Sequence, residues 1–201
     1  MSRATLRERA NRASIFRSRT LACVIENPKL IVNVMGIVRT AEALGVGQVY
    51  VIDDGKIKLP KDWQDMREDS QLVNLSASGI KWVYVKVFSS TSECLEYLSK
   101  KHFKSVGTSS HQLGKKNVPL SKGKYTQGHL AVWFGNESKG LSPEALKACE
   151  FCIQIPMYGI IESMNLSSSA SVVLNHIVGK RHEFSRKKIL KKKKKVLNET
   201  R

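Results

Sequence analysis

Polar side chains are concentrated in three segments, each next to a predicted buried strand. The segments span residues 33–39, 135–140 and 156–165, and each combines glycine or proline with amide, carboxylate or basic groups. Their polar residues are Asn33, Arg39, Asn136, Glu137, Glu162, Ser163 and Asn165. In α/β proteins, the loops at the carboxyl ends of strands bind ligands. The pattern therefore predicts a polar ligand site assembled from segments that are far apart in the chain.

Two common nucleotide sites are excluded. Residues 135–140 have the G-x4-G spacing of a phosphate-binding loop, but Leu141 and Ser142 stand where nucleotide binding needs Lys followed by Ser or Thr. Residues 45–47 (Gly-Val-Gly) lack the third glycine of a dinucleotide fingerprint and precede a strand. No Ser/His/Asp set stands out either, so the polar segments need another explanation.

The elements that must position these segments alternate between strand-like and helix-like patterns, which predicts an α/β fold. The expected strands are 21–25, 49–52, 82–88, 104–107, 130–134 and 151–155. The expected helices are 3–18, 33–44, 63–68, 90–101, 142–148 and 163–178.

Local signals define several helix ends. Ser90 and Glu93 form a capping box, and Asn33 is the expected N-cap of a helix that ends at Gly45. In the first helix, apolar residues at helical spacing are expected to face the core. These residues are Leu6, Ala10, Ala13 and Ile15.

The basic charge is concentrated at the two ends of the chain. The 201 residues carry a formal net charge of +17, of which +5 lies in residues 1–20 and +9 in residues 180–201. We therefore divide the chain into a basic N-terminal helix (1–20), one α/β domain (21–179) and a basic C-terminal tail (180–201). Basic ends of this kind predict a polyanionic partner. The lysine run is typical of a solvated, disordered tail, and we expect it to be disordered in the free protein.

The remaining composition indicates a cytoplasmic protein. No apolar run approaches the roughly 18 residues that span a bilayer, so no membrane partner is expected. The four cysteines are too few and too irregularly spaced for a disulfide scaffold, which suits a reducing compartment. Cys149 and Cys152 have no second pair at zinc-finger spacing, so we expect buried thiols and no metal. An organelle stays an alternative, because the Arg-rich, acid-poor N-terminus also has the composition of a transit peptide.

The three polar segments resemble the motifs of a known family. Residues 33–46, 134–142 and 155–165 are similar, in order and spacing, to the three motifs of the SpoU/TrmH family of RNA ribose 2′-O-methyltransferases in the SPOUT superfamily. The resemblance covers about residues 4–180. Residues 21–27 and 78–82 are most similar to the TrmH type, which modifies a guanosine in the tRNA D-loop.

The resemblance implies a fold, a cofactor and partners. The fold would be a parallel sheet flanked by helices, with a C-terminal deep trefoil knot at about residues 130–178 and basic helical extensions at both ends. The cofactor would be S-adenosyl-L-methionine, and the chain would form a homodimer with sites near the subunit interface. The substrate would be tRNA, with rRNA as the nearest alternative. A non-catalytic RNA-binding or assembly protein on the same fold is the alternative from another class.

The resemblance also assigns catalytic roles. Arg39 matches the catalytic arginine, which would either deprotonate the ribose hydroxyl after activation or hold the negative charge that forms on it. Asn33 would orient the arginine or the ribose, and Glu137 would fix the arginine or its loop. Ser163 and Asn165 would hold phosphate and shape the knot.

The cofactor and RNA contacts follow in the same way. The residues that match cofactor positions are Thr108, Gly135, Asn136, Ile155 and Met164. The expected RNA-binding residues are Arg7, Arg9, Arg12, Arg17, Arg19, Lys81, Lys180, Arg181, Arg186, Lys187 and Lys188. One position departs from the family, because Met35 replaces the usual glycine or small residue two positions after Asn33. The TrmH type varies at this position, so we interpret Met35 as tolerated, with a narrower ribose pocket as the alternative.

Overall fold

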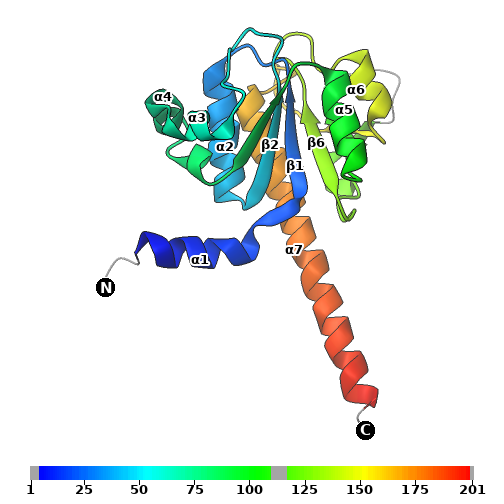
Figure 1. The fold of residues 1–201 in the computed structure, drawn as a ribbon. Helices are drawn as coiled ribbons and strands as arrows, with labels where there is room; N and C mark the ends of the chain where they lie inside the picture. Colours follow the sequence, from blue (N-terminus) through cyan, green and yellow to red (C-terminus); the bar gives the residue numbers. More distant parts are fainter. Residues whose placement is uncertain (1–4, 110–116, 200–201) are drawn as a thin grey trace.

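The protein contains one parallel sheet with helices on both faces (Figure 1). The computed structural model describes residues 5–109 and 117–199, with side chains as far as Lys191. The strands are β1 (Ser18–Glu26), β2 (Val46–Ile52), β3 (Tyr84–Phe88), β4 (Lys104–Thr108), β5 (Asn117–Pro119), β6 (Leu130–Phe134) and β7 (Cys152–Gln154). The helices are α1 (Leu6–Phe16), α2 (Ile31–Ala43), α3 (Trp63–Glu68), α4 (Ser70–Leu75), α5 (Thr91–Lys100), α6 (Pro143–Ala148) and α7 (Leu166–Glu199), with short 3-10 turns η1 (Gly79–Lys81) and η2 (Leu120–Lys122).

The sheet order is β3-β2-β1-β6-β4-β7-β5, and every paired neighbour runs parallel. The predicted α/β architecture with a parallel sheet is therefore confirmed. Since all the strands point the same way, their carboxyl ends meet at one edge, where α/β sheets bind ligands. The short edge strand β5 was not predicted, because its three residues are too few to show a periodic pattern.

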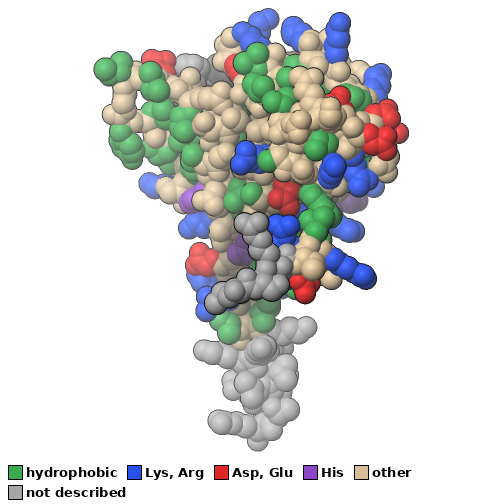
Figure 2. Space-filling model, turned by 90° about the vertical axis from the view of Figure 1, so that its left-hand side faces the viewer, with side chains coloured by type: hydrophobic (Ala, Val, Ile, Leu, Met, Phe, Trp, Pro, Cys, Tyr) green, Lys and Arg blue, Asp and Glu red, His purple; other side chains and the backbone are tan. Residues whose placement is uncertain are grey.

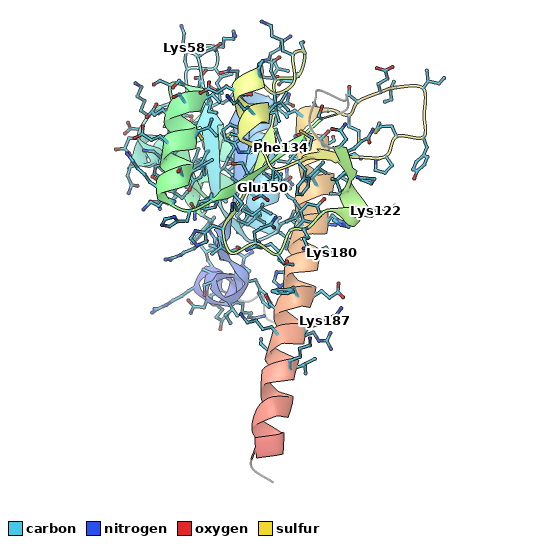
Figure 3. The ribbon with its side chains drawn as sticks, turned by 90° about the vertical axis from the view of Figure 1, so that its right-hand side faces the viewer. Lys58, Lys122, Phe134, Glu150, Lys180 and Lys187 are labelled. Atoms are coloured by element: carbon cyan, nitrogen blue, oxygen red, sulfur yellow. The ribbon has the colours of Figure 1, made fainter. Side chains whose placement is uncertain are left out.

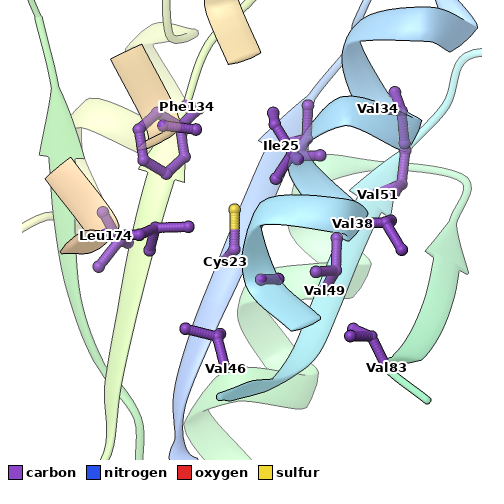
Figure 4. Close-up of a cluster of buried hydrophobic side chains, with 14 of the residues drawn as sticks. Cys23, Ile25, Val34, Val38, Val46, Val49, Val51, Val83, Phe134 and Leu174 are labelled. Carbon is purple, nitrogen blue, oxygen red and sulfur yellow. The ribbon is translucent and has the colours of Figure 1, made fainter. Parts of the chain in front are cut away.

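Alternation along the strands builds two hydrophobic layers. In β1, Cys23 and Ile25 face α2 and α7, where they pack with Val34, Val38 and Leu174 (Figure 4). The intervening residues of β1 face α5 and α6 and join the second cluster. This period of two is what a strand buried on both faces requires.

The final helix is much longer than predicted. The expected end near Val178 and the expected disorder of the tail are wrong, because α7 continues without a break to Glu199 and leaves the body (Figures 1 and 2). Its first turns pack in the core through Val173 and Ile177. Lysine and leucine favour helices, and Lys187 lies 2.7 Å from Glu183 one turn earlier. The sequence pattern failed here because a lysine run has no apolar period.

The first helix is present, but its apolar residues do not face the core. No residue of α1 is buried, and Leu6 and Ile15 are 59% and 80% exposed. Thr5 and Glu8 form a capping box that starts the helix. Figure 1 shows α1 extending sideways below the sheet, so its middle has no element to pack against.

Candidate ribose-methylation site

The three polar segments meet in one hydrogen-bond network. The Asn33 amide nitrogen donates to Glu137 Oε1 at 2.8 Å, and the Asn165 amide nitrogen donates to Asn33 Oδ1 at 3.0 Å. Asn33 is only 5% exposed, so both of its polar atoms are satisfied inside the protein. One residue from each of the three polar segments therefore takes part in the same network.

Asn33 does not have the local role predicted for it. Helix α2 begins at Ile31 with Leu30 as its N-cap, so Asn33 lies in the first turn and its amide points to Glu137. Asn165 is an N-cap, but of another helix. At the start of α7, its Oδ1 accepts the backbone N–H of Ser167 at 2.9 Å. The network therefore joins the starts of α2 and α7 to the turn after β6.

Glu137 is held as a carboxylate. Its Oε2 accepts the backbone N–H of Lys29 at 2.9 Å, and the ammonium of Lys29 donates to Ser138 Oγ. Partial burial raises the pKa of Glu137, but hydrogen bonds from Asn33 and from the backbone of Glu137, Lys29 and Leu30 outweigh it, and the pKa is lowered. At neutral pH the group is therefore a fixed acceptor with negative charge.

The loop that carries Glu137 closes on itself. Asn136 and Gly140 exchange two backbone hydrogen bonds of 3.0 and 2.9 Å. A Cβ at Gly135 would lie 2.2 Å from the carbonyl carbon of Gly140, so only glycine fits there. The Asn136 side chain donates to the carbonyl of Asn27 at 2.6 Å, which ties the loop to the end of β1. Gly135 and Asn136, both predicted cofactor residues, thus shape the loop.

A buried carboxylate that sequence reasoning missed also fixes this loop. Glu26, at the end of β1, is 1% exposed. It accepts the backbone N–H and the hydroxyl of Ser142 at 2.8 and 2.7 Å, and the hydroxyl of Thr91 at 2.5 Å. The sequence signal that could have found Glu26 is an acidic residue directly after the apolar residues 21–25. Glu26 thereby links β1 to the starts of α5 and α6.

Arg39 lies outside the network. It is exposed on α2, six residues after Asn33, which places it about 9 Å along the helix and about 120° around it. No hydrogen bond or ion pair joins its guanidinium to another residue within the described ranges. Ser163 is exposed in the loop between β7 and α7, two residues before Asn165. The structure therefore does not bring Arg39 to Asn33 within one chain.

The other predicted cofactor residues lie at the carboxyl edge of the sheet. The Thr108 hydroxyl donates to the carbonyl of Trp133 at 2.9 Å, so this side chain is occupied within the protein. Ile155 and Met164 are half-buried near the two ends of the loop between β7 and α7. Figure 3 shows this loop extending away from the body. At these three positions the protein therefore offers backbone groups and apolar side chains to a ligand.

Most of the predicted RNA-binding residues are exposed at the opposite end of the sheet. Lys and Arg side chains surround the junction of the body and the projecting α7 (Figure 2). Exposed members of the set are Arg7, Arg9, Arg12, Arg19, Lys81, Lys180, Arg186, Lys187 and Lys188. The full length of β1 separates the end of α1 from the network by roughly 30 Å.

Two arginines of that set are bound inside the protein. Arg181 donates to the carbonyls of Tyr125, Gln127 and Gly128 at 2.8, 2.7 and 3.2 Å, and to the hydroxyl of Thr20 at 2.8 Å. Burial lowers the pKa of its guanidinium. This arginine therefore anchors α7 to the sheet.

Arg17 has a similar internal role at the end of α1. It donates to the carbonyl of Trp82, and its guanidinium lies 3.6 Å from the Glu42 carboxylate. These contacts join the end of α1 to α2 and to the segment before β3. Neither Arg17 nor the anchor of α7 presents a free guanidinium to solvent.

The cysteines and the helices support no metal or membrane site in the part of the chain that is described. Cys149, at the end of α6, and Cys152, the first residue of β7, are both buried. Over residues 5–109 and 117–199, no group of three His, Cys, Asp or Glu side chains is placed to hold a metal ion. No helix in these ranges combines the length and apolarity that crossing a membrane needs.

Comparisons with known proteins agree with this geometry. A model of the SpoU rRNA methylase family matches residues 20–175. A tRNA (guanosine(18)-2′-O)-methyltransferase of Aquifex aeolicus is 30% identical over 170 residues, which cover 83% of this chain and 72% of the relative. A protein of the same name from Borreliella burgdorferi is 28% identical over 79% of this chain, and the match spans 66% of that relative.

Solved structures share the fold. A TrmH/SpoU tRNA modifying enzyme of A. aeolicus superposes with a TM-score of 0.72 at 25% identity and covers 90% of this chain and 86% of its own. The methyltransferase AviRb of Streptomyces viridochromogenes, solved with AdoMet, gives 0.69 at 23% identity over 91% of this chain and 67% of its own. Because the family model matches most of the sequence and its three motifs meet in one network, the chain belongs to the SpoU methylase family.

Proposed function

We propose that this protein transfers a methyl group from S-adenosyl-L-methionine to the 2′-hydroxyl of a guanosine ribose in the D-loop of tRNA. The observation that carries the proposal is the Asn33–Glu137–Asn165 network, because it joins the three family motifs at the ligand-binding edge of the sheet. The tRNA substrate rests on the names of the relatives from A. aeolicus and B. burgdorferi.

The residues at this edge fit the cofactor. Ile155 and Met164 offer apolar surface for an adenine, and backbone groups beside Thr108 and Gly135 offer hydrogen bonds. Because the Thr108 and Asn136 side chains are bound within the protein, their contacts to a ligand come from the main chain. When bound, the cofactor supplies an electrophilic methyl group.

The protein must then stabilise the ribose oxygen. A 2′-hydroxyl is a poor nucleophile until its developing negative charge is balanced. Arg39 is placed in the role of charge clamp, because a guanidinium normally keeps its proton. Asn33 and Asn165 fix the orientation of Glu137, whose charge would orient an arginine supplied by a second copy of the chain. The Ser163 hydroxyl, in the loop between β7 and α7, binds a phosphate of the RNA in this proposal.

We place a second copy of the chain over this site. Exposed apolar side chains occur on the segments that lead to Asn33 and Asn165, which is typical of an interaction surface. They are Leu30, Val32, Tyr158, Ile160 and Ile161, from 51% to 102% exposed. Arg39 lies on another face of α2 from Asn33, so a homodimer would supply the side of the site that one chain lacks. Ile160→Asp is expected to shift the protein to a monomer in sedimentation and to abolish methyl transfer.

The chain path and the charged ends complete the proposal. The order β6-β4-β7 and the tight closure of residues 135–140 support the trefoil knot at residues 130–178. The basic helix before residue 21 and the basic half of α7 capture RNA, whereas the nearly neutral domain between them performs the chemistry. The four buried cysteines form no disulfide, which suits the cytoplasm as the workplace.

The test is methyl transfer from labelled cofactor to unmodified tRNA and, separately, to rRNA. Label in tRNA supports the proposal. Label in rRNA alone would show that rRNA, the substrate in the name of the family model, is the substrate in place of tRNA. If neither RNA is labelled by protein that binds the cofactor, the chain is a binding protein on the same fold. Removal of residues 186–201 is expected to weaken RNA binding and to flatten its salt dependence.

A further inference from the structure

An exposed aromatic pair lies outside the network. Trp82 and Tyr84 are 40% and 38% exposed, whereas Trp133 is completely buried. Tyr84 opens β3, which is the edge strand of the sheet. Tyr and Trp are enriched at interfaces, because each combines a large apolar ring with one polar group. We call the pair Trp82 and Tyr84 the aromatic surface.

The aromatic surface is positioned beside Arg39. A Cβ at Gly79 would lie 3.2 Å from the Cα of Arg39, so the segment that leads to Trp82 touches α2 at this residue. The preceding residues Ala77 and Ser78 have φ angles of +48° and +66°, which non-glycine residues rarely adopt. Strain of this kind persists where the surrounding structure fixes a functional segment.

Packing contacts hold the Tyr84 side of the aromatic surface in place. The Tyr84 ring packs edge-on against Trp63, with 5.4 Å between centroids, and the Trp63 indole N–H donates to the carbonyl of Ile80 at 3.0 Å. The guanidinium carbon of Arg67 lies 4.8 Å from the Trp63 ring centroid. These contacts hold the Tyr84 ring from one side and tie Trp63 to the backbone just before Trp82.

Basic groups border the aromatic surface. Lys81 is exposed next to Trp82, whereas the Arg17 guanidinium is occupied by the Trp82 carbonyl and serves to hold the segment in place. Arg39 lies on the helix that supports the segment. The neighbouring acid Glu42 is offset by Arg17 at 3.6 Å. An aromatic face bordered by cations is the arrangement that binds unpaired nucleotides, because bases stack on the rings and phosphates meet the charges.

We propose that Trp82 and Tyr84 stack unpaired bases of the substrate RNA next to the nucleotide held at Arg39. The inference rests on the proposed function and adds to it a site that selects for nucleotides outside a duplex. Stacking uses the ring faces of the bases and therefore tolerates any base sequence. A paired RNA keeps its bases inside the helix and gains nothing from this surface.

The test compares a tRNA transcript with a fully paired RNA duplex, without cofactor, across a range of salt concentrations. Trp82→Ala is expected to weaken tRNA binding about 10-fold, the effect of losing one stacked base, and to leave duplex binding unchanged. Its salt slope should match that of the parent protein, because no charge is lost. Lys81→Ala, the matched control, should lower that slope by about 1. Trp82→Phe keeps a ring and should bind tRNA within about 3-fold of the parent.

Tryptophan emission gives a second measurement. Binding of tRNA is expected to quench the parent protein more than Trp82→Phe, since only the parent has an indole in the stack. The proposal is overturned if Trp82→Ala binds both RNAs like the parent, or if it loses tRNA and duplex equally. It is also overturned if Trp82→Ala changes the sedimentation coefficient, because the pair would then join two proteins. Failure of methyl transfer alone would reject the proposed function and leave these binding results standing.

Discussion

Removal of the Glu26 carboxylate should destabilise the fold through the loop that carries Glu137. Glu26 is 1% exposed and accepts three hydrogen bonds, from the backbone and hydroxyl of Ser142 and from the hydroxyl of Thr91. Glu26→Ala leaves these donors without their acceptor, and the starts of α5 and α6 lose their common anchor.

The magnitude follows from the three bonds. Hydrogen bonds to a charged group contribute about 1.5–3 kcal/mol each, and water entering the vacated space would replace part of them. We therefore expect Glu26→Ala to lower the free energy of unfolding by about 4 kcal/mol and the melting temperature by roughly 8–16 °C for a chain of this size. Glu26→Gln keeps one acceptor oxygen and should cost about half as much.

The assay is urea unfolding followed by circular dichroism, at one protein concentration so that any association is constant. Glu93→Ala is the control, because this exposed carboxylate also accepts a backbone N–H, from Ser89 at 2.9 Å, and should cost only about 1 kcal/mol. If Glu26→Ala unfolds at the same urea concentration as the control, the carboxylate does not hold the two helix starts, and the reasoning is wrong.

Three further predictions concern charge and burial. Because the pKa of Glu137 is lowered in the fold, the carboxylate stabilises the protein above the unfolded pKa, and this stabilisation is lost as pH falls through the folded pKa. The unfolding free energies of the parent and of Glu137→Gln should therefore converge in acid. A constant difference between pH 7 and 3 would contradict this. Arg181→Lys should cost about 2 kcal/mol in urea unfolding, since one ammonium cannot reach four acceptors, whereas Lys180→Ala should stay within about 0.5; equal effects would remove the anchoring role. All four cysteines are buried and should resist a thiol reagent at pH 8 until the protein unfolds. For Cys94, burial and the nearby carboxylates also raise the thiol pKa to about 12. Rapid labelling of the cysteines in the folded protein would disprove their burial.

Local sequence signals predicted the elements whose causes are local. The apolar run at 130–134 gave β6 with its observed bounds, and the cap at Ser142 gave the start of α6. Helix α3 also has its predicted bounds, Trp63–Glu68, because Asp62 caps it. Periodicity and capping depend on neighbours within a few residues, so a single sequence contains them.

Features with distant causes needed the structure. Asn33 has the local chemistry of a cap, but its partners Glu137 and Asn165 lie more than 100 residues away in the chain. Likewise, Arg181 has the sequence context of a basic tail, but the carbonyls it binds lie on the loop before β6. Of the residues that the resemblance named as catalytic, the structure joins Asn33, Glu137 and Asn165, whereas Arg39 and Ser163 lie outside their network, and the roles of all five stay predictions.

The most direct test of the account is the identity of the methylated nucleoside. Unmodified tRNA would be incubated with labelled cofactor and the parent protein or Arg39→Ala, then digested completely and separated by chromatography. The account predicts labelled 2′-O-methylguanosine from the parent and none from Arg39→Ala, with equal cofactor affinity in both. A base-methylated product from the parent, or the same yield of 2′-O-methylguanosine from Arg39→Ala, would contradict it.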